Sequence, residues 1–222
     1  MATRHPDHTI RAITALTVAV TERPWSITAR DLDAPRAAGL DDASILHVVL
    51  QCANFCHLNR IADAVGVAAD YPDRFGAPHV EPATPAYLLP FDPPASGSGL
   101  IELALRPGTE VYEAWRAYAL DRDTPSLDRR RRGVIARAVA DRLGDLRERP
   151  AADPVDDLDH ALVEIADLTT LAPWKLGPAA YHRIRALGLA DDAQVFDAVA
   201  TASSCQVFSR IAVTLAGFAR QS

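Results

Sequence analysis

Positions 41–62 read DDASILHVVLQCANFCHLNRIA, and positions 191–212 read DDAQVFDAVATASSCQVFSRIA. Seven of these 22 positions are identical, and the two stretches align without a gap. Upstream, Pro24-Trp25 and Gly39-Leu40 recur in the same order as Pro173-Trp174 and Gly188-Leu189, 149 rather than 150 residues later. The chain therefore contains an internal duplication. Residues that both copies keep are expected to have a structural role. Residues present in one copy only are the candidates for a functional role.

Apolar residues recur with helical spacing in both copies, and no run alternates in the way that is typical of a strand. Asp41 or Asp42 can cap a long helix that runs to Gly66, and Asp191 or Asp192 can cap its counterpart, since acids at these positions satisfy free N–H groups. The pattern predicts an all-α fold. The expected helices are 6–22, 28–39 and 42–66 in the first copy and 154–171, 177–188 and 192 onward in the second.

The region between the copies has a different composition. Seven of the sixteen prolines lie between Pro72 and Pro94, and a Ser-Gly-Ser-Gly run follows at 96–99. Because proline excludes regular helix, we expect a first helical repeat at 1–71, a crossover linker at 72–99, and a second unit at 100–222 that contains the second repeat. This second unit has three further expected helices, at 100–106, 110–121 and 127–147. We expect the whole chain to form one compact domain.

The charge balance bears on the class of partner. The 222 residues are 49% hydrophobic and carry a formal net charge of -6, which argues against a broad surface for nucleic acid or anionic lipid. The run Arg129-Arg130-Arg131-Arg132 is an exception. Acids lie close to it in the sequence, so we expect it to form a solvated or subunit-facing helix surface. The partners expected on this basis are a small-molecule substrate and further copies of this chain, with no nucleic acid.

The cysteines and the N-terminus bear on location. Three cysteines, Cys52, Cys56 and Cys205, are an odd number in a chain too large to need disulfides, and this favours a reducing compartment. The first residues are polar, and no stretch approaches the roughly 18 uncharged apolar residues of a membrane span. We therefore expect a cytoplasmic protein without a membrane partner.

The sequence motifs around the first Gly-Leu turn resemble those of a known family. Residues 38–49 and 54–67 are similar to the peroxidase-related branch of the carboxymuconolactone decarboxylase and alkylhydroperoxidase D-like superfamily, which has a Gly-Leu-acid-acid turn and an Asn-Arg-x-Ala-Asp helix. The order of features from Glu102 to Thr169 also resembles that branch. The resemblance covers most of the chain. It implies an alkylhydroperoxidase D-like helical fold and an oligomer, either a homodimer or a homotrimer.

The redox motif of that family is absent from its usual place. The alkylhydroperoxidase signature is a Glu followed by Cys-x-x-Cys-x-x-x-His, in which two thiols form a disulfide and the Glu and His relay a proton. The matching region here, from Val134 to Leu146, contains neither Cys nor His. Hydroperoxide reduction by that mechanism therefore does not follow from the resemblance.

Reactive side chains are concentrated instead on the long helix of the first copy. At about 100° per residue, Cys52, Cys56, Arg60 and Asp63 share one stripe, while His57 lies roughly a quarter turn away. We expect the cysteines to face the core and the stripe to turn polar at its C-terminal end. The second copy has Ala202 and Gln206 in place of the two cysteines. The candidate residues are Cys52, Asn54, Cys56, His57, Asn59, Arg60 and Asp63.

Each candidate also has a plain structural interpretation. The cysteines could be packing thiols, a reactive thiol beside His57, or two ligands of a metal. Their i,i+4 spacing places the Cβ atoms about 6 Å apart, which is poor for a disulfide, and the sequence offers no further ligand pair for zinc, so we expect no metal. Arg60 could pair with Asp63 and hold the helix to its neighbour, and His57 could simply bind a carbonyl.

The resemblance and these residues together favour a small-molecule enzyme. In the first hypothesis, His57 carries a proton and Arg60 holds the anionic group of an organic acid or lactone, with Asn54, Asn59, Cys52 and Asp63 binding the substrate. The reaction would be decarboxylation, isomerisation or elimination. The alternative is a peroxidase-like oxidoreductase that uses Cys56 with His57, and Cys52 or an external thiol as resolving partner. A third is a non-catalytic oligomeric scaffold or ligand-binding protein. No cofactor motif is present, so none is expected.

Overall fold

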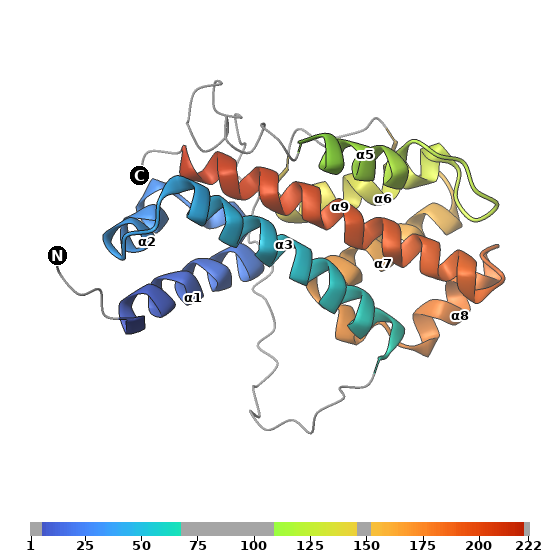
Figure 1. Ribbon diagram of the computed structural model, residues 1–222. Coiled ribbons are helices and arrows are strands. Elements are labelled where there is room, and N and C mark those ends of the chain that lie inside the picture. The colour runs from blue at the N-terminus through green and yellow to red at the C-terminus, as the bar shows by residue number, and fades with distance from the viewer. Residues whose placement is uncertain (1–5, 68–108, 146–151, 220–222) are drawn as a thin grey trace.

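The computed structural model describes residues 6–67, 109–145 and 152–219, and every regular element in these ranges is helical (Figure 1). The prediction of an all-α fold is confirmed for these residues. The expected linker at 72–99 and the helix expected at 100–106 lie outside the described residues.

The two copies have matching helices. The first contains α1 (Pro6–Glu22), η1 (Pro24–Ser26), η2 (Ala29–Leu32), α2 (Asp33–Ala37) and α3 (Asp42–Val65). The second contains α7 (Asp157–Leu171), η4 (Pro173–Lys175), α8 (Pro178–Ala186) and α9 (Asp192–Phe218). Two helices without a counterpart in the first copy are α5 (Thr109–Leu120) and α6 (Arg129–Leu143). One expectation is corrected, because the segment expected as one helix at 28–39 is a 3₁₀ turn followed by the short α2.

Local capping explains where the long helices begin and end. The Asp41 carboxylate accepts a hydrogen bond from the Ser44 amide at 2.8 Å, and Asp191 accepts from the Gln194 amide at 2.8 Å. These bonds satisfy N–H groups that a first helical turn leaves free. The chain leaves α3 at Gly66, whose φ of 73° is in the left-handed region that favours glycine. The predicted capping by an acid is confirmed, and of the two acids at each helix start it is Asp41 and Asp191 that form the cap.

The long helices α3 and α9 lie against each other near the middle of the molecule (Figure 1). Helix α1 packs on α3, and α7 packs on α9, so each copy forms a similar pair. Helix α6 packs on both α7 and α9. By length and composition α9 could cross a membrane, but 83% of its most apolar window is buried among the other helices. Its apolar character is therefore explained by its place in the core.

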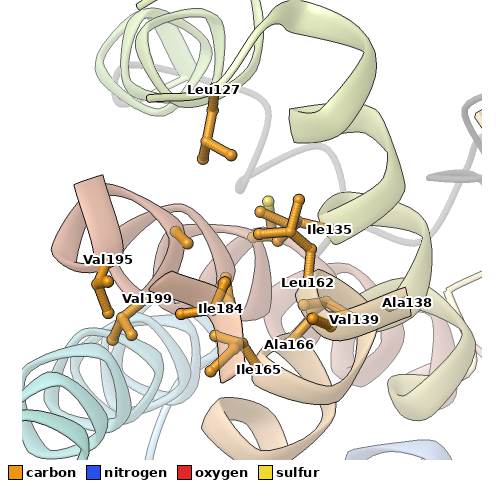
Figure 2. Packing of buried hydrophobic residues seen from close by; sticks show 14 of the residues in the cluster. Leu127, Ile135, Ala138, Val139, Leu162, Ile165, Ala166, Ile184, Val195 and Val199 are labelled. Atoms are coloured by element: carbon orange, nitrogen blue, oxygen red, sulfur yellow. The ribbon is translucent and has the colours of Figure 1, made fainter. Parts of the chain in front are cut away.

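The buried apolar side chains form two clusters. Figure 2 shows part of the larger one, in which Ile135 of α6, Leu162 and Ile165 of α7, and Val199 of α9 pack together. The smaller cluster joins α1 and α3 to the far end of α9, and includes Leu16, Ile45, Leu215 and Phe218. The core of the first copy is therefore completed by the last turns of the second.

An equivalent pair of arginines also joins the copies. The Arg60 Nε of α3 donates to the carbonyl of Thr170 in α7 at 3.0 Å. The Arg210 Nη1 of α9 donates to the carbonyls of Val20 and Thr21 in α1, at 2.6 and 2.5 Å. Arg210 is the repeat counterpart of Arg60, and Thr170 is that of Thr21. Each long helix thus binds the end of the other copy's first helix.

Ionic contacts fix α6 to the second copy. Arg132 is 0% exposed, and its Nη2 and Nη1 donate to the Asp197 carboxylate at 2.6 and 3.2 Å. Arg130 and Arg131 bind Asp159 of α7. The expectation that the whole arginine run would form a solvated or subunit-facing surface is wrong for Arg132. Its burial is possible because Asp197 supplies a countercharge inside the fold.

Candidate functional site

A cavity of about 390 Å³ lies between α1 and α3. Its apolar wall is formed by Ile13, Val48 and Phe55, and its polar groups include Thr17 and Thr21 of α1. Four residues that the sequence had singled out also line it. These four are Cys52, Cys56, Asn59 and Arg60. Two further residues of α3, His47 and Gln51, also line the cavity.

The second copy explains why this space is open. Ile13 and Thr17 correspond to Leu162 and Ala166, which are buried in the cluster that includes α6. Likewise, His47 corresponds to Asp197, the carboxylate that binds Arg132 of α6. Helix α6 therefore occupies, in the second copy, the place that corresponds to the cavity. No helix covers α1 and α3 in this way within the ranges 6–67, 109–145 and 152–219.

The two thiols lie at the buried side of the cavity. Cys52 is 7% exposed and Cys56 is 4% exposed, and both are free. The Thr21 hydroxyl forms hydrogen bonds with both thiols. Its Oγ1 is 3.1 Å from the Cys52 Sγ and accepts from the Cys56 Sγ at 3.7 Å. The Cys52 Sγ also lies 3.6 Å from the carbonyl of Thr17. Their predicted position on the core-facing stripe is confirmed.

The surroundings distinguish the two thiols electrostatically. The pKa of Cys56 is lowered because Cys52 donates a hydrogen bond to it and because Arg210 and Arg60 are close, and these effects outweigh its burial. The pKa of Cys52 is raised by the same hydrogen bond, by burial and by the charge of Cys56. Cys56 is therefore the thiol of this pair that loses its proton more easily, which makes its sulfur the better candidate nucleophile.

Two guanidinium groups approach these thiols. Arg210 is 1% exposed, and burial, followed by the charge of Arg60, lowers its pKa to about 10. Its Nε donates to the Gln206 Oε1 at 3.0 Å. Arg60 lines the cavity and donates to the carbonyls of Thr170 and Cys56. No ion pair between Arg60 and Asp63 is present in the described part of the chain, so the pairing considered from the sequence is not formed.

His57 faces away from the cavity. Its ring packs edge-on against Trp115 of α5, with ring centroids 5.1 Å apart, and its backbone carbonyl accepts from the Ser203 hydroxyl. Burial lowers the pKa of His57, and the buried Nδ1 has no hydrogen-bond partner among the described residues. Asn54 and Asp63 are exposed and do not line the cavity. Three predicted site residues are therefore separated from the other four.

Sequence reasoning missed three residues that contribute to this site. Thr21 is 31 positions from Cys52 in the chain, and no local pattern indicates that contact. His47 could have been found by extending the helical projection one turn back from Gln51. Arg210 could have been found through the repeat, as the counterpart of Arg60. Within the described residues, no group of three or more His, Cys, Asp or Glu side chains is placed to hold a metal ion.

Comparisons with known proteins gave no match. No family model, no curated protein and no solved structure is significantly similar to this chain. The resemblance to the alkylhydroperoxidase D-like superfamily therefore stays a prediction that rests on the motifs of this sequence.

Proposed function

We propose that this protein is a thiol-dependent oxidoreductase that reduces a small hydroperoxide, with Cys56 as its nucleophile. One observation carries the proposal: two thiols, the Thr21 hydroxyl and a guanidinium group meet in one cavity. A thiolate stabilised by nearby cations is the usual form of a reactive cysteine. Compared with the alternative derived from the sequence, Cys52 and Thr21 replace His57 as the groups beside Cys56.

The proposed reaction has an oxidising and a reducing half. The Cys56 thiolate attacks the terminal peroxide oxygen, an S–O bond forms and the O–O bond breaks. Both electrons of that bond leave with the alkoxide, which takes a proton from water to give an alcohol. Cys56 becomes a sulfenic acid. A low-molecular-weight thiol then forms a mixed disulfide with Cys56 and releases water. A second thiol displaces the Cys56 thiolate and gives an external disulfide and a proton.

An external thiol is proposed as the reductant because of the helix geometry. Cys52 and Cys56 are one turn apart on the continuous helix α3, so their Cβ atoms are about 6 Å apart. A disulfide requires about 3.5–4.5 Å between Cβ atoms. Cys52 is therefore assigned the role of a hydrogen-bond donor that holds the charge on Cys56, rather than that of a resolving thiol.

The test is turnover of an alkyl hydroperoxide with a small thiol, combined with trapping of the sulfenic acid by a dimedone reagent and mass spectrometry. We expect the adduct on Cys56, and Cys56→Ser should lose both the adduct and turnover. Cys205→Ser is the matched control, since Cys205 is a buried cysteine in the other apolar cluster. Full turnover by Cys56→Ser would contradict the proposal.

A second candidate is the acid–base enzyme for an organic acid that the sequence suggested, with His47 in the place of His57. It is favoured by the presence of His47 and Arg60 in the wall of the same cavity. In that case His47→Ala would abolish turnover of the organic acid while Cys56→Ser would retain it. His160→Ala, a change of an exposed histidine on α7, serves as the control.

We also infer that the helices adopt an alkylhydroperoxidase D-like arrangement and assemble as a homodimer or homotrimer. The support is the motif resemblance together with the duplicated helix pairs α1–α3 and α7–α9. Light scattering coupled to size-exclusion chromatography measures the assembly directly, and a monomer at micromolar concentration would contradict the second part.

A further inference from the structure

The cavity that contains Cys52 and Cys56 has arginine side chains around it but, among the residues that the structure describes, no carboxylate in its wall. Arg60 is in its wall, and Arg210 lies behind the thiols. The hydrogen bonds of both guanidinium groups go to neutral acceptors, which are backbone carbonyls and the Gln206 side chain. Within the described residues, neither arginine forms an ion pair with a carboxylate, and no Asp or Glu lines the cavity.

Among the described residues, the other buried arginine has a carboxylate partner. Arg132 is fully buried, as Arg210 is, and its guanidinium binds the Asp197 carboxylate at 2.6 Å. Burying a guanidinium without a countercharge is costly, because water no longer solvates it. No acid among the described residues balances Arg210 or Arg60 in this way, so an anion that enters the cavity meets positive charge without a carboxylate beside it.

The Cys56 thiolate can balance one of these two positive charges. Asp63, three residues from Arg60, and Glu22, which follows Thr21, are exposed and form no ion pair with either arginine in the part of the chain that the structure describes. One positive charge is left over, and it belongs to Arg60, since Arg210 is enclosed and next to both thiols. His47, which also lines the cavity, would add to this charge when protonated.

We propose that the cavity selects substrates that carry one negative charge, a carboxylate above all, and that Arg60 is the residue that binds this charge. The apolar side chains of Ile13, Val48 and Phe55 would contact the rest of the molecule, and about 390 Å³ is enough for a small organic acid. This inference rests on the proposed function in one respect, namely that Cys56 is the group that reacts. It makes the substrate a hydroperoxide with an anionic group.

Two alkylating reagents of nearly equal size test the charge preference without any turnover. Iodoacetate is an anion and iodoacetamide is neutral, and both react when the thiolate attacks the CH₂ carbon, forming a C–S bond and releasing iodide. The rate at Cys56 is measured for each reagent by quenching and tandem mass spectrometry of the full-length protein. The same rate ratio is measured for a small free thiol.

We expect the ratio of the iodoacetate rate to the iodoacetamide rate to be about tenfold higher at Cys56 than at the free thiol, because a fixed charge within several ångströms attracts the anion. Arg60→Met should bring the ratio down to that of the free thiol, and Arg60→Lys should keep most of the preference. Arg183→Met is the matched control, because this exposed arginine on α8 pairs with Glu164 away from the cavity.

The outcomes separate the two proposals. If Cys56 reacts with both reagents at the free-thiol ratio, and Arg60→Met changes nothing, the anion preference is overturned while the thiol function stands. If neither reagent labels Cys56 in the folded protein but both label it after denaturation, the nucleophile itself is excluded and both proposals fail. Circular dichroism of each variant ensures that the rates refer to folded protein.

Discussion

The two copies of the repeat use the same arginine position for the same purpose but have different surfaces. Arg60 binds the carbonyl of Thr170, and Arg210 binds that of Thr21, so the residues kept in both copies connect the halves. The surfaces differ because α6 covers α7 and α9. The aspartates of α7 and α9 that bind arginines of α6 are Asp159, Asp167 and Asp197, and they correspond to Ile10, Val18 and His47 in the first copy.

This difference shows how a site can arise from a duplicated scaffold. In the second copy the place beside the long helix is filled by α6 and the residues there are Ala202 and Gln206. In the first copy the corresponding place is a cavity, and the residues are Cys52 and Cys56. The candidate reactive residues of the first copy therefore occupy positions that the second copy uses for packing between helices.

Removing the anchor of α6 should have the largest effect. Asp197→Ala would leave the fully buried Arg132 without its countercharge, and we expect the free energy of unfolding to fall by about 3–5 kcal/mol. The repeat supplies the control: His47→Ala, at the equivalent exposed position, should change it by less than about 0.5 kcal/mol. Urea denaturation measures both. Equal losses of stability would show that position 197 on the α6-covered face of the second copy is no more important for packing than position 47 on the open face of the first.

The cross-copy arginines should be unequal in strength. Arg210→Ala deprives two backbone carbonyls and the Gln206 side chain of their donor in a fully buried setting, and we expect a loss of about 2–3 kcal/mol. Arg60→Ala removes bonds from a half-buried position and should cost about 1 kcal/mol. The comparison is made from urea midpoints at constant m-value. A larger loss for Arg60→Ala would reverse this order.

Acid should weaken the second copy through Asp159. Burial raises the pKa of this carboxyl, but hydrogen bonds from Arg130, the Val155 amide and Arg131 outweigh it and bring the pKa to about 2. Because the folded pKa is below the unfolded value, the contribution, about 1–2 kcal/mol, is present above about pH 4 and is lost as the pH falls towards 2. Thermal unfolding of wild type and Asp159→Asn between pH 2 and 6 measures it. A variant as pH-sensitive as the wild type would exclude Asp159 as the source.

Replacing the thiols of the first copy by the residues of the second should have the smallest effect on stability. We expect Cys52→Ala/Cys56→Gln to change the free energy of unfolding by less than about 1 kcal/mol. The cavity beside Cys56 leaves room for the longer side chain, and the introduced amide oxygen can accept from Arg60 as the Gln206 oxygen accepts from Arg210, which replaces the thiolate as an acceptor. The same variant should lose peroxide turnover entirely. Retained turnover would show that the asymmetry between the copies is unrelated to the chemistry.

The sequence predicted the features that depend on neighbours within about four residues. The caps at Asp41 and Asp191 and the end of α3 at Gly66 are of this kind, as is the shared face of Cys52 and Cys56. Helical projection also separated His57 from the thiols by a quarter turn. It could not show that His57 meets Trp115, or that Arg132 is enclosed by Asp197, because those partners are 58 and 65 residues away. Long-range packing decides which polar residues share a space.

The joining of the two copies has a consequence for the order in which the chain can fold. The core of the first copy includes Leu215 and Phe218, and the end of α1 is bound by Arg210, 190 residues from Val20. During synthesis, α1 and α3 therefore leave the ribosome long before α9, which completes their core. Contacts across such long loops are slow to form. We expect the first copy alone to expose apolar surface and to depend on chaperones until α9 has been made.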